Sequence, residues 1–356
     1  MRRCILVGNL QNMNDYIVEA REREQNLLIV EGNHEKNKLF WLILKCFPEI
    51  NIDIDNVWIY GTNIYILYDD IVKEYGSEWR KENDDIDLPF VISKKQNPDM
   101  LRYRTDFNNI IIVFDYERHD KNFSEDKIVE MQGYFTDATD MGKLYINYPM
   151  IESYQHLQSL PDNDYAERKI PVSLQPGRKY KALVKNESVI VKAVEFPHRL
   201  NDLLNGYFGI VNECVRDRCC NAIFDISDDK NIVDIIQGVL QGTIEDSKFQ
   251  TAIYHLNDWV IRCGYAHNGD TYWKYMRNIF RQIIYHNICK ANRIQNGKYN
   301  VENDKLKMCF EHLNLTEVLK TQNLLSKDVN TGIIWVLNTC VFFVAEYNFA
   351  LVIKDR

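Results

Sequence analysis

The stretch Leu27–Leu28–Ile29–Val30–Glu31–Gly32–Asn33–His34–Glu35–Lys36 is an apolar run of strand length that ends abruptly in acid. Further along the chain, Ile110–Ile111–Ile112–Val113–Phe114–Asp115–Tyr116–Glu117 has the same character. Continuous apolar runs bounded by polar residues are typical of strands buried on both faces of a parallel sheet. The carboxyl edge of such a sheet is where α/β folds bind their ligands. We therefore predict two buried strands whose acidic ends form a candidate cation site.

Helical and strand-like patterns alternate around these two stretches. Apolar residues recur at helical spacing over residues 39–46 and 64–79. Shorter apolar runs predict the remaining strands, Cys4–Val7, Val57–Tyr60 and Leu144–Tyr148. Residues 82–109 read as a polar excursion. Because alternating strands and helices are typical of α/β folds, we predict a mostly parallel sheet flanked by helices over residues 1–157.

The composition changes after this predicted domain. Residues 158–198 contain four prolines and one alternating patch at Val189–Val191, so we expect a connecting region with a short strand or hairpin. From residue 199 to 356 the apolar spacing is helical, and the apolar stretch 333–344 reads as a buried core helix. We predict an all-α C-terminal domain here.

The overall composition narrows the class of protein. With 356 residues, 46% hydrophobic and 26% charged, the chain fits a globular protein of two domains. No apolar run approaches the roughly 20 residues that a membrane span needs. Nine cysteines without CxxC pairs fit a reducing compartment, so we expect a cytoplasmic protein. A net charge of −8 argues against a general polyanion-binding surface, so any nucleic-acid contact must be local or metal-mediated.

The acids at the two strand ends suggest a specific chemistry. Glu31 ends one strand, and Glu35 is expected in the first turn of the following helix. Asp115 and Glu117 are two residues apart, so on an extended segment both point the same way. Clustered carboxylates repel one another unless a divalent cation neutralises them. Ligands that are all oxygen favour Mg²⁺ or Mn²⁺ over Zn²⁺.

Phosphoryl-transfer chemistry is the natural use of such a site. One or two divalent ions activate water and stabilise the leaving oxygen of a phosphodiester. Gly32 lets the backbone turn tightly and a substrate approach, and Lys36 or Lys38 could hold a phosphate.

These residues resemble a known family. An apolar strand into Glu–Gly, an acid four residues on, and a later strand into Asp–x–acid are similar to the TOPRIM (topoisomerase–primase) domain. The chain resembles the TOPRIM nucleases of the OLD family and of bacterial abortive-infection systems, including the TOPRIM effector of the PARIS anti-phage system. The resemblance covers residues 26–155. Glu31, Glu35 and Asp115 match the motif acids, and Glu117 stands where Asp is commoner.

The resemblance implies Mg²⁺-dependent cleavage of nucleic acid, DNA or tRNA, by a toxic effector of anti-phage defence. Asp120 and Glu152 are candidate ligands of a second metal ion. The candidate catalytic residues are the four motif acids and Lys36, whose ammonium could hold a phosphate. Such nucleases commonly work with an ATPase, and because this chain has no GxxxxGK[ST] loop, the ATPase would be a separate protein. A homodimer stays open.

One segment of the helical region is a candidate nucleic-acid interface. Lys274, Arg277 and Arg281 share one helical face, opposite an apolar face. The alternative is a solvated basic face, or a contact with a partner protein.

Two other functions remain open at this point. Arg281 and His286 have the Arg–x4–His spacing of metal-independent HEPN ribonucleases, although five residues on a regular helix separate two side chains by roughly 140°. The TOPRIM-like core could also be a non-catalytic scaffold or regulatory module that binds a nucleotide or an ATPase.

Overall fold

A computed structural model describes residues 26–82, 85–174, 176–302 and 304–353. Its centre is a six-stranded sheet in the order β2-β1-β3-β5-β4, with β8 also pairing with β5. The bounds of these strands are β1 Asn26–Val30, β2 Val57–Ile59, β3 Asn109–Asp115, β4 Thr136–Asp137, β5 Gly142–Tyr148 and β8 Leu337–Asn338. β2, β1, β3 and β5 run parallel, and β4 and β8 pair antiparallel with β5. The expected mostly parallel sheet is confirmed, while the strand predicted at Cys4–Val7 lies outside the described residues.

The apolar runs form the centre of the sheet. Residues 27–30 of β1 and 110–114 of β3 are buried. Where β1 pairs with β3, Val30 lies opposite Val113. Where β3 pairs with β5, Asp115 lies opposite Asn147. The carboxyl ends of all three strands therefore reach the same edge.

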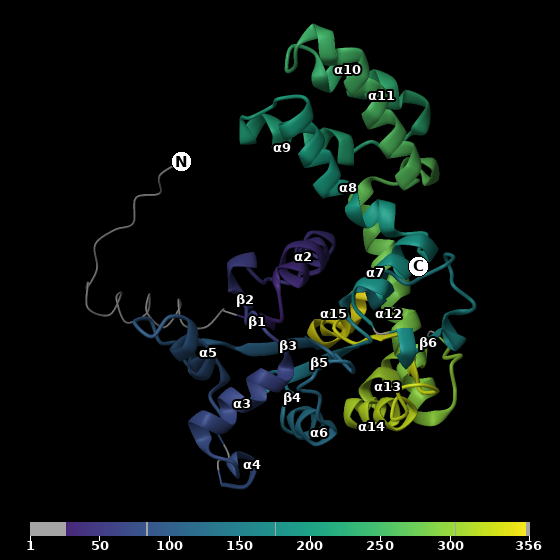
Figure 1. Cartoon of the computed structure of the whole chain (residues 1–356). Helices are drawn as coiled ribbons and strands as arrows, with labels where there is room; N and C mark the ends of the chain where they lie inside the picture. Colours follow the sequence, from purple (N-terminus) through teal and green to yellow (C-terminus); the bar gives the residue numbers. More distant parts are fainter. Residues whose placement is uncertain (1–25, 83–84, 175, 303, 354–356) are drawn as a thin grey trace.

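Helices cover both faces of the sheet. A π-helical turn, η1 (Glu35–Phe40), leads into α2 (Trp41–Cys46) on one face. α3 (Ile64–Tyr75) and α6 (Glu125–Tyr134) lie on the other face (Figure 1). The predicted helix over 64–79 is two elements, because the chain leaves α3 at Gly76, where φ is 88°, before α4 (Trp79–Glu82) begins.

The prediction of a polar excursion over residues 82–109 is wrong in its middle. α5 (Leu88–Gln96) forms there, and it begins at a helix signal in the sequence. The Asp87 side chain accepts a hydrogen bond from the backbone N–H of Phe90 at 2.9 Å, and Pro89 lies in the first turn.

The remainder of the chain is mostly helical. Its helices are α7 Arg178–Glu187, α8 Val191–Asp202, α9 Glu213–Phe224, α10 Ile232–Leu240, α11 Asp246–Cys263, α12 Tyr272–Asn296, α13 Leu306–Glu311, α14 Leu315–Leu325 and α15 Phe342–Tyr347. In Figure 1, α9, α10 and α11 project away from the sheet, and α12 runs from this projection down beside it.

Two further predictions for this region are wrong. The patch at Val189–Val191 forms the junction between α7 and α8 instead of a strand, and Val191 is the first residue of α8. The stretch 333–344 holds two strands, β7 (Ile333–Trp335) and β8, followed by α15. β7 pairs with β6 (Lys169–Pro171) and β8 joins the central sheet, so the C-terminal region is not all-α.

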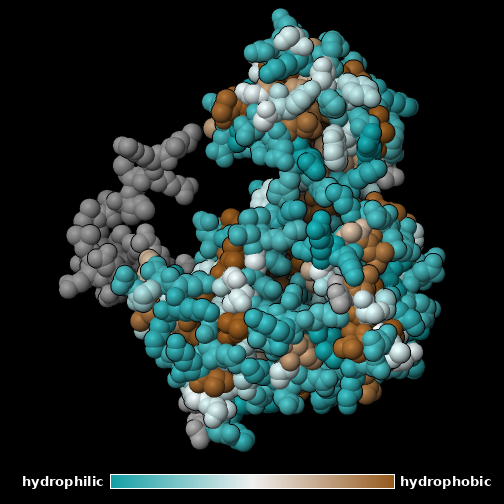
Figure 2. All heavy atoms as spheres, viewed as in Figure 1, coloured by the Kyte–Doolittle hydropathy of each residue, from teal (hydrophilic) through white to brown (hydrophobic). Residues whose placement is uncertain are grey.

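The described helices include none that combines the length and apolar character needed to cross a membrane. Figure 2 shows a visible face that is largely hydrophilic, with hydrophobic residues in separate groups.

Candidate metal centre at the carboxyl edge of the sheet

The two acidic strand ends meet. Glu31 directly follows β1, and Asp115 is the last residue of β3. The backbone N–H of Asp115 donates a hydrogen bond to Oε2 of Glu31 over 3.3 Å. Asp115 is only 4% exposed, and its Oδ1 lies 3.4 Å from the side-chain amide of Asn147 on the neighbouring strand β5. The parallel register thus brings together acids that are 84 residues apart.

Glu35 joins this pair from the first turn of η1. Its side chain is buried, and its Oε2 lies 3.1 Å from the position that a Cβ at residue 32 would occupy. Gly32 therefore lets the Glu35 carboxylate approach the turn closely, which a larger residue would obstruct.

Glu117 reaches the site by a different route from the one predicted. β3 ends at Asp115, and Glu117 has φ = 46°, in the left-handed region that residues with a side chain seldom adopt. The backbone N–H of Asp120 donates to the Glu117 carbonyl at 2.8 Å and closes a turn. Tyr116 anchors this turn, because its buried hydroxyl donates to Oδ1 of Asn323 in α14 at 2.6 Å. The expectation of an extended segment was wrong, since the chain turns directly after β3.

Glu152 approaches the site from the end of β5, which lies beside β3 on the side opposite β1. It lies in a 3₁₀ turn, Ile151–Gln155, after β5 and is 5% exposed. Its Oε1 forms an ion pair with Nζ of Lys181 at 3.1 Å and lies 3.4 Å from Nε2 of His34. Its Oε2 is buried and has no hydrogen-bond partner among the described residues. Lys181 was not predicted, because a single lysine on a distant helix carries no sequence signal.

Electrostatics joins these acids into one group. Negative charges within a group of six carboxylates, which we call the acidic cluster, help to raise the pKa values of Glu31, Glu35, Asp115 and Glu117. The cluster consists of these four residues together with Asp120 and Glu152. Burial, followed by the negative charge of Glu117, raises the pKa of Glu31 to about 8. Burial and then the charge of Glu31 raise the pKa of Asp115 well above its ordinary value. Repulsion therefore opposes full ionisation of the cluster.

Lys36 has a different partner from the one expected of a phosphate ligand. Its Nζ donates to the backbone carbonyl of Val57 in β2 over 2.9 Å. The ammonium therefore ties η1 to the neighbouring strand and is not placed among the acids.

The three cations of the predicted nucleic-acid stripe also have partners within the protein. Lys274 pairs with Asp270 at 2.6 Å. Arg277 bonds Glu49 at 2.7 Å, and Nε of Arg281 donates to the Leu351 carbonyl at 2.9 Å. The three basic side chains of this face of α12 are therefore engaged in ion pairs and hydrogen bonds within the protein.

His286 of the proposed HEPN pair is largely buried. Its Nε2 accepts a hydrogen bond from the backbone N–H of Asp162 at 3.2 Å, and its Nδ1 lies 2.6 Å from the Tyr299 hydroxyl. His286 and Arg281 line one cavity of about 570 Å³, but both ring nitrogens are occupied. A base needs a free nitrogen, which this histidine lacks.

The acidic cluster fits a divalent cation by its chemistry, whereas its present arrangement is not a finished metal cage. Its donors are all oxygen, as Mg²⁺ and Mn²⁺ prefer, and one of them, Oε2 of Glu152, is buried without a hydrogen bond. Within the described part of the chain, however, no group of three or more His, Cys, Asp and Glu side chains could hold a metal ion as it stands. A metal site at the acidic cluster would therefore require rotation of its side chains.

Comparison with known proteins gives no independent assignment. No family model matches the chain, and no curated protein or solved structure matches it significantly. Function has to be inferred from the acidic cluster itself.

Proposed function

We propose that this chain is a Mg²⁺-dependent nuclease, with Mn²⁺ as the alternative ion, that hydrolyses phosphodiester bonds of DNA or tRNA at the acidic cluster. The observation that carries this proposal is the contact between Glu31 and Asp115 at adjacent parallel strand ends. Keeping like charges together in a buried place costs stability, and such strongly perturbed groups are typical of functional sites.

The residues of the chain have distinct tasks in this proposal. Glu31, Glu35 and Asp115 would hold the ion, and Glu117, Asp120 and Glu152 complete the ligand set or hold a second ion. When bound, the ion supplies an activated water and stabilises the leaving oxygen. The backbone N–H of Asp115 orients Glu31, and Asn147 orients Asp115.

The biological role in the proposal comes from the resemblance to TOPRIM nucleases. In this proposal the protein is a toxic effector of anti-phage defence, and a separate ATPase protein restrains its activity. Neither the ATPase nor the choice between DNA and tRNA enters the chemistry proposed for the acidic cluster.

The test is incubation of the purified protein with Mg²⁺, DNA and tRNA, with and without EDTA. We expect cleavage that EDTA abolishes and that Glu31→Gln removes, because the variant loses one charged ligand at nearly unchanged volume. Glu213→Gln is the matched control, since Glu213 is exposed at the start of α9.

Three results would contradict the proposal. Cleavage that persists in EDTA would argue for metal-independent chemistry, and full activity of Glu31→Gln would remove the acidic cluster from the reaction. Inactivity of the wild type on every substrate, with or without a candidate ATPase, would favour the scaffold.

A further inference from the structure

A small cavity of about 140 Å³ lies beside the acidic cluster. Five basic side chains line it, and we call it the basic pocket: His34, Lys38, Lys181, Lys185 and His198. His34 directly precedes η1 and Lys38 lies in its last turn, whereas the others come from α7 and α8. Segments far apart in the sequence thus place basic groups around one space.

Glu152 connects the basic pocket to the acidic cluster. Its side chain lines the pocket, and its Oε1 pairs with Lys181 and lies 3.4 Å from Nε2 of His34. On its other side the negative charge of Glu152 acts on Asp115 and Glu35, whose pKa values it helps to raise, after burial, which is the largest cause for both. The Glu152 carboxylate therefore lies between the basic pocket and the acidic cluster and interacts with both.

The basic pocket has more positive than negative charge. Its three lysines face two glutamates, Glu152 and Glu195. Among the described residues, Lys38 and Lys185 have no ion-pair partner, whereas Lys181 has Glu152. An incoming anion would meet lysine ammonium groups that the protein does not neutralise.

We propose that the basic pocket binds a backbone phosphate of the nucleic-acid substrate, adjacent to the phosphate that is cleaved. This inference rests on the proposed nuclease function and specifies how the substrate is held. A cavity of this volume accommodates a phosphate but falls short of the roughly 300 Å³ at which ligand pockets begin. Backbone phosphates position a nucleic acid without reading its sequence. The basic pocket therefore fixes the register of the strand over the acidic cluster.

The first test uses inorganic phosphate and the full-length protein in EDTA, followed by NMR of the histidine rings. We expect saturable shifts of the His34 and His198 signals, while His312, exposed directly after α13 and outside the lining of the basic pocket, stays unchanged. The variant Lys38→Gln/Lys185→Gln should abolish the saturable shift. Absence of saturation in the wild type, or equal shifts in the variant, would overturn the proposal.

The second test measures binding of DNA and tRNA in Ca²⁺, in a Glu31→Gln background that prevents cleavage. Lys38→Gln/Lys185→Gln should weaken binding by about tenfold and reduce the slope of log K against log salt by about 1, as expected for one lost phosphate contact. Lys179→Gln is the control with the same charge change per residue, because Lys179 is exposed on α7 and lies ~200° around that helix from Lys181.

The two proposals can fail separately. If the wild type cleaves but the pocket variant binds nucleic acid as tightly as the Lys179→Gln control, only the basic pocket is refuted. If free phosphate binds while the affinity for nucleic acid is the same in the pocket variant, the pocket binds phosphate but not a phosphate of the nucleic-acid backbone, and the proposal is refuted. Unchanged circular dichroism of each variant confirms that a loss reflects the pocket.

Discussion

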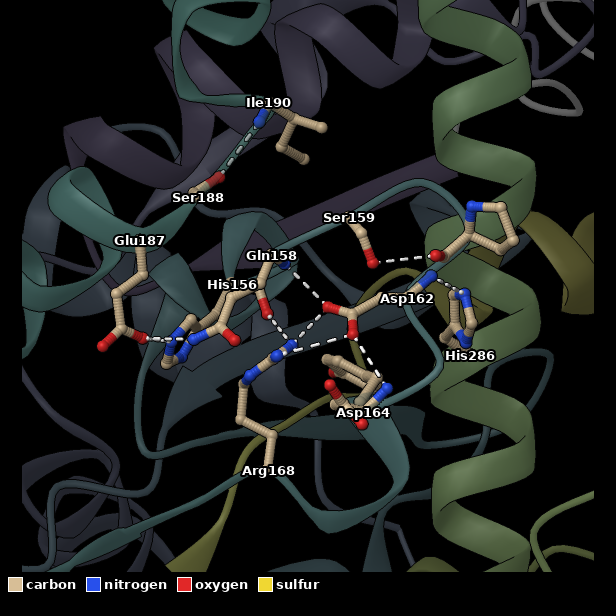
Figure 3. Close-up of polar contacts among 12 residues, drawn as sticks. His156, Gln158, Ser159, Asp162, Asp164, Arg168, Glu187, Ser188, Ile190 and His286 are labelled. Carbon is tan, nitrogen blue, oxygen red and sulfur yellow. Dashed lines mark hydrogen bonds and ion pairs between the residues drawn. The ribbon is translucent and has the colours of Figure 1, made fainter.

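Two regions of the molecule bury charged groups in opposite ways. In the acidic cluster, carboxylates crowd together, and burial raises the pKa of Asp115 well above its ordinary value. In a second region, which we call the paired network and which is drawn in Figure 3, Asp162 accepts hydrogen bonds from the Arg168 guanidinium and from the backbone N–H of Gln158 and Asp164. Burial also acts to raise the pKa of Asp162, but these bonds outweigh it and leave the pKa below its ordinary value.

The paired network is complete within the chain. His156 bonds Glu187 at 2.8 Å, and His286 accepts the Asp162 N–H, so the network ties the segment after Glu152 to α7 and α12 (Figure 3). Asp115 and Asp162, both with little exposed surface, thus differ in whether the protein supplies a neutralising cation in direct contact. The comparison teaches that burial alone does not distinguish the two regions. The missing compensation of charge is what leads us to propose a functional site at the acidic cluster.

The largest expected effect is on catalysis. Asp115→Asn should reduce Mg²⁺-dependent cleavage by about 10³-fold, because a metal ligand contributes several kcal/mol to the transition state. Without metal, the variant should be at least as stable as the wild type, since a repelled buried charge is removed. Cleavage assays and thermal unfolding measure the two effects, with exposed Asp234→Asn on α10 as the control. Loss of both activity and stability would mean that Asp115 is structural.

The equivalent change in the paired network should act on stability. Asp162→Asn leaves the buried Arg168 without its counter-charge, which typically costs about 3–5 kcal/mol. Urea unfolding should show this loss, in contrast to Asp115→Asn. Equal stability of the two variants would abolish the distinction between the regions.

The pH dependence of stability should come from the acidic cluster. The pKa of Glu31 is raised from 4.5 to about 8 on folding, so the folded state binds more protons between these values. The contribution of Glu31 to the free energy of unfolding is therefore fully present below pH 4.5 and is lost as the pH rises through 8. Glu31→Gln should flatten the decline and raise the metal-free Tm at pH 8 by roughly 2–4 °C for each kcal/mol recovered.

Metal binding provides the check on this titration. Mg²⁺ competes with protons for the carboxylates, so it should raise the Tm more at pH 8 than at pH 5. A Mg²⁺ effect independent of pH, or a wild-type Tm that rises from pH 5 to 8 as much as that of Glu31→Gln, would show that Glu31 does not titrate in this way.

The smallest expected effect concerns the turn after β3. Because Glu117 has φ = 46°, Glu117→Gly should be more stable than Glu117→Ala by about 1 kcal/mol, which isolates the cost of the left-handed backbone. Both variants lose the carboxylate, so their difference is independent of charge. Urea midpoints measure it, and equal midpoints would mean that the turn relaxes.

Apolar runs in the sequence were sufficient to predict the four parallel strands of the sheet and the edge at which they meet. Parallel strands with acids after the last apolar residue bring those acids together in any register close to the observed one, so the meeting of Glu31 and Asp115 was predictable. The turn at Glu117 was not, because it depends on Tyr116 reaching α14, a contact that local sequence does not encode.

The remaining differences also come from long-range contacts. Lys36 has the right spacing to point toward the acids, but the carbonyl of Val57 is a nearer acceptor once β2 lies beside β1. The stretch 333–344 has the apolar content of a core helix, yet the Asn338 side chain bonds the Ile151 carbonyl and Ser153, and the backbone joins the sheet. Only the tertiary structure decides between these outcomes.

Strand β8 has a consequence for any attempt to divide the protein. The hydroxyl of Thr339 donates to the Ile146 carbonyl at 2.8 Å, and the backbone N–H of Cys340 donates to the side chain of Asn147, the residue beside Asp115. A truncated chain ending at residue 155 would keep every motif acid but lose the support behind one of them. Residues 26–155 are thus not a transplantable module, and the late part of the chain is as necessary to the geometry of the acidic cluster as the acids themselves.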